Sequence, residues 1–328
     1  AIYGANTLYP ARWAELAGAY NMRGHGLAAV RLNPVRYNPV SGKLHFATGL
    51  DITVRTSEPI RPMGGATTAV HSPNALFDSL AASLVVNPHE MASDIPTALD
   101  EPTDTIDYLL ITSPGLTNAF QALVDHRGST VGGSYGAAMV TTDWIDSNYT
   151  GEDIQSRIRN CIRDYVNNHN TSYVCLGGSS QDVPDRDCRV SAGGYTRSDM
   201  PTDLYYSDLD GTWNADGDSY YGESGDDDEE MDMMPDVVVG RITVDTAQQA
   251  TNYITKLVDY ETNFETINST IGRTLLMAGQ NCFGSIAYGD DRPSDLLNDG
   301  YPEFRDRSGG VSDSEVDSRR MYRDNMRP

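Results

Sequence analysis

The sequence predicts an α/β fold in which a parallel sheet is covered by helices and is preceded by a small antiparallel β region. Three observations predict it. Short, nearly continuous apolar runs such as "IDYLLITS" at residues 106–113 are typical of strands buried on both faces. These runs alternate with segments of helical periodicity, which indicates crossover helices on a parallel sheet. The first 60 residues instead alternate apolar and polar residues between Asn-Pro and Ser-Gly turns, as antiparallel hairpins do.

These patterns divide the chain into four regions. Residues 1–60 form the β-rich region. Residues 61–103 are rich in Pro, Gly, Ala and Ser, and we expect a connecting segment in which only "NALFDSLAASLVV" is helical. Residues 104–265 form the first α/β subdomain, and residues 266–328 begin a second one.

Within the α/β part the elements are expected in a fixed order. Strands are predicted at residues 106–113, 135–145, 172–180, 235–242 and 272–280, and helices at residues 115–128, 151–167 and 246–260. Ligands of such sheets bind beyond the carboxyl ends of the strands. Those ends carry residues 113–115, 177–180 and 279–282, which places any site along this edge.

The charge balance excludes whole classes of partner. The 328 residues carry a net charge of −23 and only two lysines, so nucleic acid and anionic membranes should be repelled. No apolar run is long enough to span a bilayer, and the N-terminus has no signal-peptide pattern, so we expect no membrane insertion and an already removed signal. Sequons at Asn148, Asn170 and Asn268 are compatible with glycosylation of an extracellular or cell-surface protein.

The most acidic segment, "DLYYSDLDGTWNADGDSYYGE" at residues 203–223, predicts a calcium site. Alternating Asp and Asn with Gly lets a tight loop aim six to eight oxygens at one cation. The expected ligands are Asp208, Asp210, Asn214, Asp216, Asp218 and Glu223. Clustered carboxylates repel each other unless a cation compensates. A solvated acidic loop without a cation is the alternative.

The four cysteines fit no zinc pattern but permit disulfides. Cys161 lies on an apolar helix face and Cys175 lies inside a strand, so both should be small core residues. Cys188 and Cys282 each follow the carboxyl end of a strand and could form a disulfide. Cys282 is a poor candidate nucleophile, because His169, the last histidine, is expected at the opposite edge of the sheet.

Several stretches resemble, in order and spacing, the gingipain-type cysteine endopeptidases, whose fold is related to that of caspases. They are "VRLNPVRYNPVSGKL", "YLLITSPGLTNAFQALVDHR", "VTTDWI", "YVCLGGSSQDVPDR", "TDLYYSDLDGTWNADGDSYYGE" and "MPDVVVGRITV". The resemblance implies a secreted thiol protease that acts on proteins or peptides. It also implies that residues 1–60 are the end of a propeptide, hence a zymogen or a retained inhibitor, and that the catalytic subdomain begins at residue 266.

The resemblance assigns no catalytic residue to this chain. The family's catalytic His and Cys lie downstream of the strand matching "TLLMAGQ", and no His follows His169 and no Cys follows Cys282. The dyad would then lie C-terminal to this chain, for example on a companion chain. Loss of catalysis is the alternative, giving an extracellular surface, filament or scaffold protein, and a homo-oligomer is compatible with either function. The resemblance implies that Asp290 or Asp291 selects a basic substrate side chain, although an acidic loop or a second calcium site fits them equally well.

Overall fold

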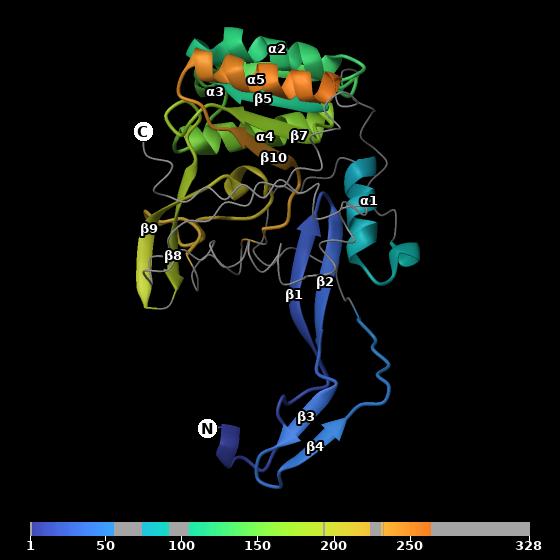
Figure 1. Cartoon of the computed structure of the whole chain (residues 1–328). Coiled ribbons are helices and arrows are strands. Elements are labelled where there is room, and N and C mark those ends of the chain that lie inside the picture. The colour runs from blue at the N-terminus through green and yellow to red at the C-terminus, as the bar shows by residue number, and fades with distance from the viewer. Residues whose placement is uncertain are drawn as a thin grey trace, which may run out of the picture. The chain divides into compact units, whose positions relative to one another are not determined.

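The computed structural model describes residues 2–55, 74–91, 105–192, 194–223, 231 and 233–263. Within them the predicted fold class is confirmed. Helices flank a parallel four-stranded sheet, and the chain also forms small antiparallel sheets (Figure 1). The predicted strand at residues 272–280 lies outside these ranges. Four short 3-10 helices complete the described elements: η1 (Ile2–Gly4), η2 (Pro88–Glu90), η3 (Pro114–Leu116) and η4 (Leu204–Tyr206).

The parallel sheet has the strand order β10-β7-β5-β6. Its strands are β5 (Tyr108–Thr112), β6 (Ala137–Thr141), β7 (Tyr173–Gly177) and β10 (Val238–Ile242). All neighbours are parallel, and Tyr108 at the start of β5 lies opposite both Ala137 and Tyr173. β5 is central and almost wholly buried, which explains its continuous apolar sequence.

Helices cover both faces of this sheet (Figure 1). On one face α2 (Thr117–Gly128) and α5 (Ala247–Thr262) pack on Leu110 and Cys175. On the other face α3 (Thr142–Asn148) and α4 (Ile154–His169) pack on Leu109 and Ile111. Successive strand residues therefore enter two separate cores, because side chains alternate across a strand.

None of the helices in the described ranges has both the length and the apolar character needed to cross a bilayer.

One predicted strand ends early. Residues 135–145 were expected to be extended, but β6 stops at Thr141 and "TDWI" is the start of α3. The Thr141 hydroxyl accepts a hydrogen bond from the backbone N–H of Trp144 at 3.2 Å, which caps the helix. Within α3, Ile145 is buried whereas Trp144 is exposed.

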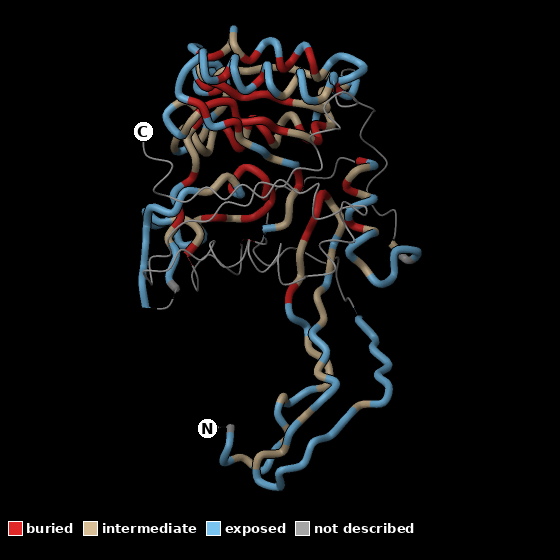
Figure 2. The backbone as a smooth tube through the Cα atoms, in the orientation of Figure 1, coloured by how far each residue is buried: buried red, intermediate tan, exposed pale blue. Residues whose placement is uncertain are grey.

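In the described residues, the N-terminal part contains two antiparallel hairpins and an α-helix. β1 (Ala14–Met22) pairs with β2 (His25–Leu32), β3 (Val35–Asn38) pairs with β4 (Lys43–Phe46), and α1 (Ala75–Leu84) follows. Burial in the first hairpin is greatest at its turn, near α1 (Figure 2). Residues 1–258 form one compact unit that includes these hairpins and the parallel sheet.

A further hairpin, β8 (Arg186–Ala192) with β9 (Tyr195–Thr202), has no counterpart in the sequence-based prediction. β9 is exposed along nearly its whole length, so it has no buried face to produce an alternating apolar pattern. The pairing also shifts register between Cys188 and Val190. Such a ribbon leaves little hydrophobic signal in the sequence.

Candidate functional site

The carboxyl edge of the sheet is built by short polar contacts. The Ser113 hydroxyl donates to Asp182 Oδ1 at 2.6 Å, and the Thr112 hydroxyl donates to the Gly177 carbonyl at 2.6 Å. Gly178 has a φ of +134°, and a Cβ added there would lie 2.4 Å from the Asp182 Cβ. Only glycine therefore fits between β7 and the loop that follows it.

Arg241 of β10 ties the acidic segment to this edge. Its guanidinium donates to both carboxylate oxygens of Asp203 at 2.8 and 2.7 Å. It also donates to the carbonyls of Gly178 and Val183 at 3.1 and 2.7 Å. The start of the acidic segment is thus fixed beside the place where a parallel sheet binds ligands.

The six predicted calcium ligands divide into two groups. Asp208 and Asp210 are buried and lie with Asp236, a residue that the sequence-based prediction omitted. Asp216 and Asp218 are exposed and lie with Glu223. In each group the carboxylate oxygens lie within 4.8 Å of one another.

The buried group, which we call the inner cluster (Asp208, Asp210 and Asp236), is surrounded by arginines. Arg159 of α4 donates to the Asp208 carbonyl from Nε and Nη2, at 3.0 and 2.5 Å. Arg163, one turn later, donates to the Leu209 carbonyl.

These bonds go to backbone carbonyls, and Arg159 Nη2 lies 3.9 Å from Asp208 Oδ1, so the guanidinium groups place positive charge beside the carboxylates. The arginines therefore offset part of the negative charge of the inner cluster, and calcium binding by Asp208 and Asp210 stays a prediction.

Burial dominates the pKa values around the inner cluster. It raises the pKa of Asp208, against the opposing effects of Arg159 and of the N–H groups of Gly211 and Met233. Burial, together with the neighbouring charge of Arg159, also lowers the pKa of Arg163 to about 10. Opposite charges thus face each other in a dry environment, where removing one partner is costly.

The second group, the outer cluster (Asn214, Asp216, Asp218 and Glu223), lies in a tight turn. Asp216 Oδ1 accepts the N–H of Asp218 at 3.1 Å, and Asp218 Oδ1 accepts the N–H of Tyr220 at 2.6 Å. The Asn214 amide donates to the Asp218 carbonyl at 3.0 Å, while its own Oδ1 is buried without a hydrogen-bond partner among the described residues. That oxygen and the remaining carboxylate oxygens could serve a hard cation.

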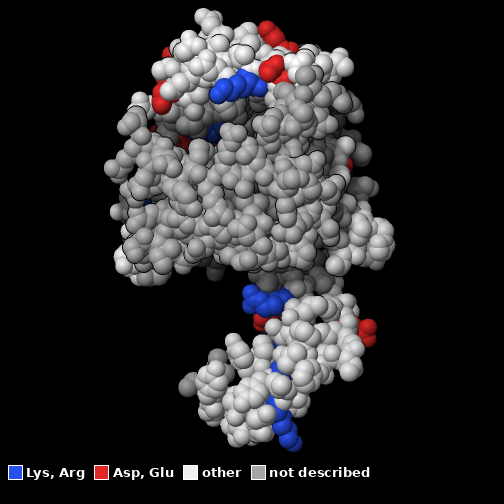
Figure 3. Space-filling view, in the orientation of Figure 1, with Lys and Arg blue, Asp and Glu red and all other residues white. Residues whose placement is uncertain are grey.

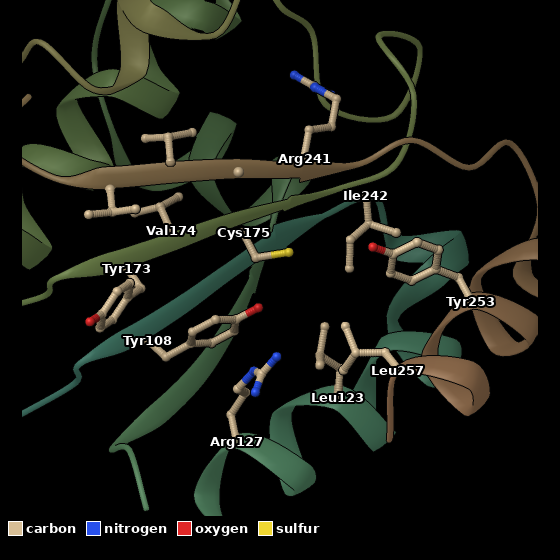
Figure 4. A pocket seen from close by; sticks show the side chains of 13 residues that line it. Tyr108, Leu123, Arg127, Tyr173, Val174, Cys175, Arg241, Ile242, Tyr253 and Leu257 are labelled. Atoms are coloured by element: carbon tan, nitrogen blue, oxygen red, sulfur yellow. The ribbon is translucent and has the colours of Figure 1, made fainter. Parts of the chain in front are cut away.

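A separate recess of about 310 Å³ lies on the face of the sheet covered by α2 and α5 (Figure 4). Tyr108, Arg127 and Cys175 line it together with apolar side chains. Arg127 lies over the Tyr108 ring at 5.8 Å, and burial raises the pKa of the Cys175 thiol. The thiol is therefore not activated, because a nucleophilic cysteine needs a lowered pKa.

The prediction that Cys161 and Cys175 are core residues is confirmed, because both are buried in the cores on the two faces of the sheet. Burial raises the pKa of Cys161 to about 12. Cys188 is also buried, beside Gly222. Its predicted disulfide partner Cys282 lies outside the described residues, as do Asp290 and Asp291 and the sequon at Asn268, so these assignments stay predictions.

The other two sequons lie in different environments. Asn148 is exposed in the last turn of α3, and its amide donates to the Trp144 carbonyl at 2.8 Å. Asn170 follows α4 with a φ of +55°, and its Oδ1 accepts hydrogen bonds from Arg23 and Asn74. A glycan is easier to accommodate at Asn148, while both remain predicted acceptors.

Four residues that organise the site were missed from sequence: Arg23, Arg159, Arg163 and Asp236. Arg159 and Arg163 are four residues apart beside the apolar face of a predicted helix, which was a usable sign that they share a target. Asp236 lies near the start of the predicted strand at residues 235–242, and Arg23 stands in a turn. From the sequence alone, neither position shows whether the charged side chain is buried or solvated.

Comparison with known proteins identifies the family of this chain. The sequence model of peptidase family C25 matches residues 101–327. No curated protein matches significantly. Two solved structures are similar. One is titled as a protease and has 17% identity and a TM-score of 0.38, with 56% of this chain and 34% of that chain covered. The other is dimeric latent PorU from Porphyromonas gingivalis, which has 14% identity and a TM-score of 0.36, with 58% of this chain and 18% of that chain covered. This chain thus spans about a third or less of either structure. By the match over most of its length, the chain belongs to peptidase family C25, the gingipain family that its sequence resembles.

Proposed function

We propose that this chain is part of a cysteine endopeptidase that hydrolyses peptide bonds in protein substrates. The observation that carries the proposal is the family match across residues 101–327. The polar carboxyl edge around Ser113, Gly178 and Asp182 supports it, because substrates of open parallel sheets bind at that edge.

The nucleophile and its base belong to sequence outside the described residues, C-terminal to this chain as the resemblance implies. Burial raises the pKa of Cys161 and Cys175, which opposes thiolate formation. His126 and His169 lie in the last turns of α2 and α4. In the proposed reaction the catalytic His removes the thiol proton, and the thiolate adds to the scissile carbonyl. The C–N bond then breaks and the amine leaves with the proton held by the His, after which water hydrolyses the thioester to a free carboxylic acid and the thiol.

Residues 1–60 are proposed to be the end of a propeptide, so that the protein is a secreted zymogen or keeps this region as an inhibitor. The net charge of −23 supports an extracellular or cell-surface location, where calcium is plentiful. Asp290 or Asp291 would recognise a basic side chain of the substrate.

Calcium is proposed to bind the outer cluster rather than all six predicted ligands. Asn214, Asp216, Asp218 and Glu223 offer amide and carboxylate oxygens, including the buried Asn214 Oδ1. Glu223 Oε1 accepts a hydrogen bond from Arg189 at 2.6 Å, which would hold this carboxylate in place. Asp208 and Asp210 are assigned instead to the inner cluster with its arginines.

A thiol-reactive peptidyl probe tests the peptidase proposal. The full-length protein, activated by removal of its N-terminal region, should hydrolyse a peptide substrate and take up the probe on one cysteine. Peptide mapping should place the label on a cysteine other than Cys161, Cys175 or Cys188. A folded, processed protein that neither labels nor hydrolyses would contradict the proposal and favour a scaffold function. Ordered polymers in micrographs would strengthen that second interpretation.

A further inference from the structure

The turn of the first hairpin carries an arginine that is almost completely buried. Arg23 joins β1 to β2 and is only 1% exposed, although arginine is rarely buried without a dedicated set of acceptors. Arg23 and Gly24 have φ values of +50° and +90°, and the Gly24 N–H donates to Asn21 Oδ1 at 2.9 Å. The turn therefore presents the arginine in one fixed direction.

The guanidinium spans acceptors that are far away in the sequence. Arg23 Nη1 donates to the carbonyls of Thr171 and Asp236 at 2.7 and 2.8 Å, and Nη2 donates to Asn170 Oδ1 at 2.9 Å. The Arg23 backbone N–H donates to Asp236 Oδ1 at 2.8 Å. Asn170 and Thr171 precede β7 and Asp236 precedes β10, so the hairpin turn meets the amino-terminal edge of the parallel sheet.

Apolar side chains also pack around this arginine. Met22, Phe77 and Ala81 form a small buried cluster that joins the hairpin to α1. The Arg23 guanidinium lies over the Phe77 ring at 5.2 Å. Figure 2 shows buried backbone at this end of the hairpin and exposed backbone towards β3 and β4. The attachment is therefore concentrated at the turn.

Asp236 connects this attachment to the acidic segment. Its Oδ1 accepts the Arg23 N–H, and its Oδ2 accepts the Leu209 N–H at 2.8 Å. Leu209 lies between Asp208 and Asp210 of the inner cluster. A single buried carboxylate thus holds the hairpin with one oxygen and the acidic segment with the other.

We propose that the recess formed by Asn170, Thr171, Asp236 and Phe77 is an arginine-specific docking site for the N-terminal hairpin. Through Asp236, docking of the hairpin orders the segment around Leu209. The hairpin stays bound after the chain is cut between Arg55 and Asn74, because its contacts do not depend on that connection. Lysine cannot replace the arginine, since one ammonium group lacks the planar fork that reaches three separate acceptors.

The chemistry of the site distinguishes Arg23 from the other basic residues of the hairpins. Figure 3 shows Lys and Arg side chains on the surface of this N-terminal part. Arg31, for example, is exposed and pairs with Glu15 at 3.3 Å. Exposed pairs of this kind contribute little. Arg31 is therefore the matched control for Arg23 on the same hairpin.

The test uses the whole chain with a specific protease site inserted between Arg55 and Asn74. After complete cleavage, checked on a denaturing gel, gel filtration measures how much N-terminal fragment stays with the remainder. We expect retention in the parent protein and in Arg31→Ala. Arg23→Ala and Arg23→Lys should each weaken retention at least tenfold. Hydrogen exchange of uncut protein should be faster around Leu209 in both Arg23 variants, but unchanged in Arg31→Ala.

Two results would overturn the proposal. Equal retention of the fragment in Arg23→Lys and in the parent would show that the docking is not arginine-specific. Retention lost equally in Arg31→Ala would show that general charge, and not the recess, holds the hairpin. If Arg23→Ala does not fold, Arg23→Lys, which keeps the charge, decides the question alone. The test does not depend on peptidase activity.

Discussion

Arg186 and Asp153 form a two-point ion pair, with Nη1 to Oδ2 at 2.7 Å and Nη2 to Oδ1 at 2.9 Å. The pair links β8 to the N-terminus of α4, where Asp153 Oδ1 also accepts the Ser156 N–H at 2.8 Å. The Arg186 guanidinium lies over the Tyr221 ring at 3.9 Å. One carboxylate thus caps the helix and anchors the otherwise exposed hairpin.

Asp153→Asn should keep the helix cap and remove the ion pair, because Asn is also a good N-cap residue. We expect a loss of about 1–3 kcal/mol near pH 7, since a charged hydrogen bond of a buried guanidinium is lost. Urea unfolding followed by circular dichroism measures it. A variant as stable as the parent would show that the pair is neutral in free energy.

The same substitution should change the dependence of stability on pH. Burial alone would raise the pKa of Asp153, but hydrogen bonds from Arg186 and Ser156 lower it below its ordinary value. The carboxylate therefore contributes fully above its unfolded pKa of about 3.9, and its contribution disappears as the pH falls through the folded pKa. Parent and variant stabilities should converge below about pH 4. A constant difference down to pH 2 would contradict this assignment.

Arg159→Met should destabilise the protein far more than Arg157→Met on the same helix. Arg159 is buried and serves the carbonyls of Asp208 and Gly211, whereas Arg157 pairs with Asp146 at the surface. Removing one partner of a buried charge group costs about 3–5 kcal/mol, and loss of an exposed pair costs about 0–1 kcal/mol. Equilibrium unfolding of both variants gives the comparison. Equal losses would mean that the inner cluster does not depend on its arginines.

Much of the fold was predictable because its signals are local. The apolar run of β5 and the helical periodicity of α4 each report burial directly, and both elements were found within a few residues. The β8–β9 ribbon was missed because its residues are exposed and make few apolar contacts. The end of β6 was missed because Thr141 acts as a cap only once the chain turns there.

The site was harder to predict because its grouping depends on distant contacts. The spacing of carboxylates in residues 208–223 indicated a cation site, but it could not separate the inner from the outer cluster. That separation requires Arg159, which lies 49 residues before Asp208 in sequence, and Asp236, which lies beyond the end of the acidic segment. A local pattern identifies candidate ligands, while the tertiary fold decides which charges compensate them.

Gly178→Ala should disturb the carboxyl edge of the sheet. Its φ of +134° is strained for any other residue, and the new Cβ would lie 2.4 Å from the Asp182 Cβ. We expect a loss of at least about 1–3 kcal/mol, the usual cost of such strain. Gly240→Ala, where a Cβ meets nothing within 4 Å, is the control and should be nearly neutral. Thermal unfolding compares the two, and a stable Gly178→Ala would show that this loop adjusts freely.

Calcium should stabilise the protein through the outer cluster. If calcium binds only the folded state, a hundredfold excess over Kd adds about 2.7 kcal/mol of stability. Calorimetry should therefore show a higher Tm with calcium than with a chelator. The double variant D216N/D218N should lose this difference, because it removes two exposed carboxylates without disturbing a buried one. Asp125→Asn, which changes an exposed carboxylate on α2, should keep it.

Asp208→Asn separates the two clusters in the same experiment. It should lower the Tm with and without calcium, because it removes a charge that faces Arg159 in the inner cluster. The increment due to calcium should nevertheless remain, since the proposed ligands lie in the outer cluster. An increment abolished by Asp208→Asn but unaffected by D216N/D218N would move the cation to the inner cluster. An unchanged Tm of the parent with calcium and with chelator would remove the calcium proposal altogether.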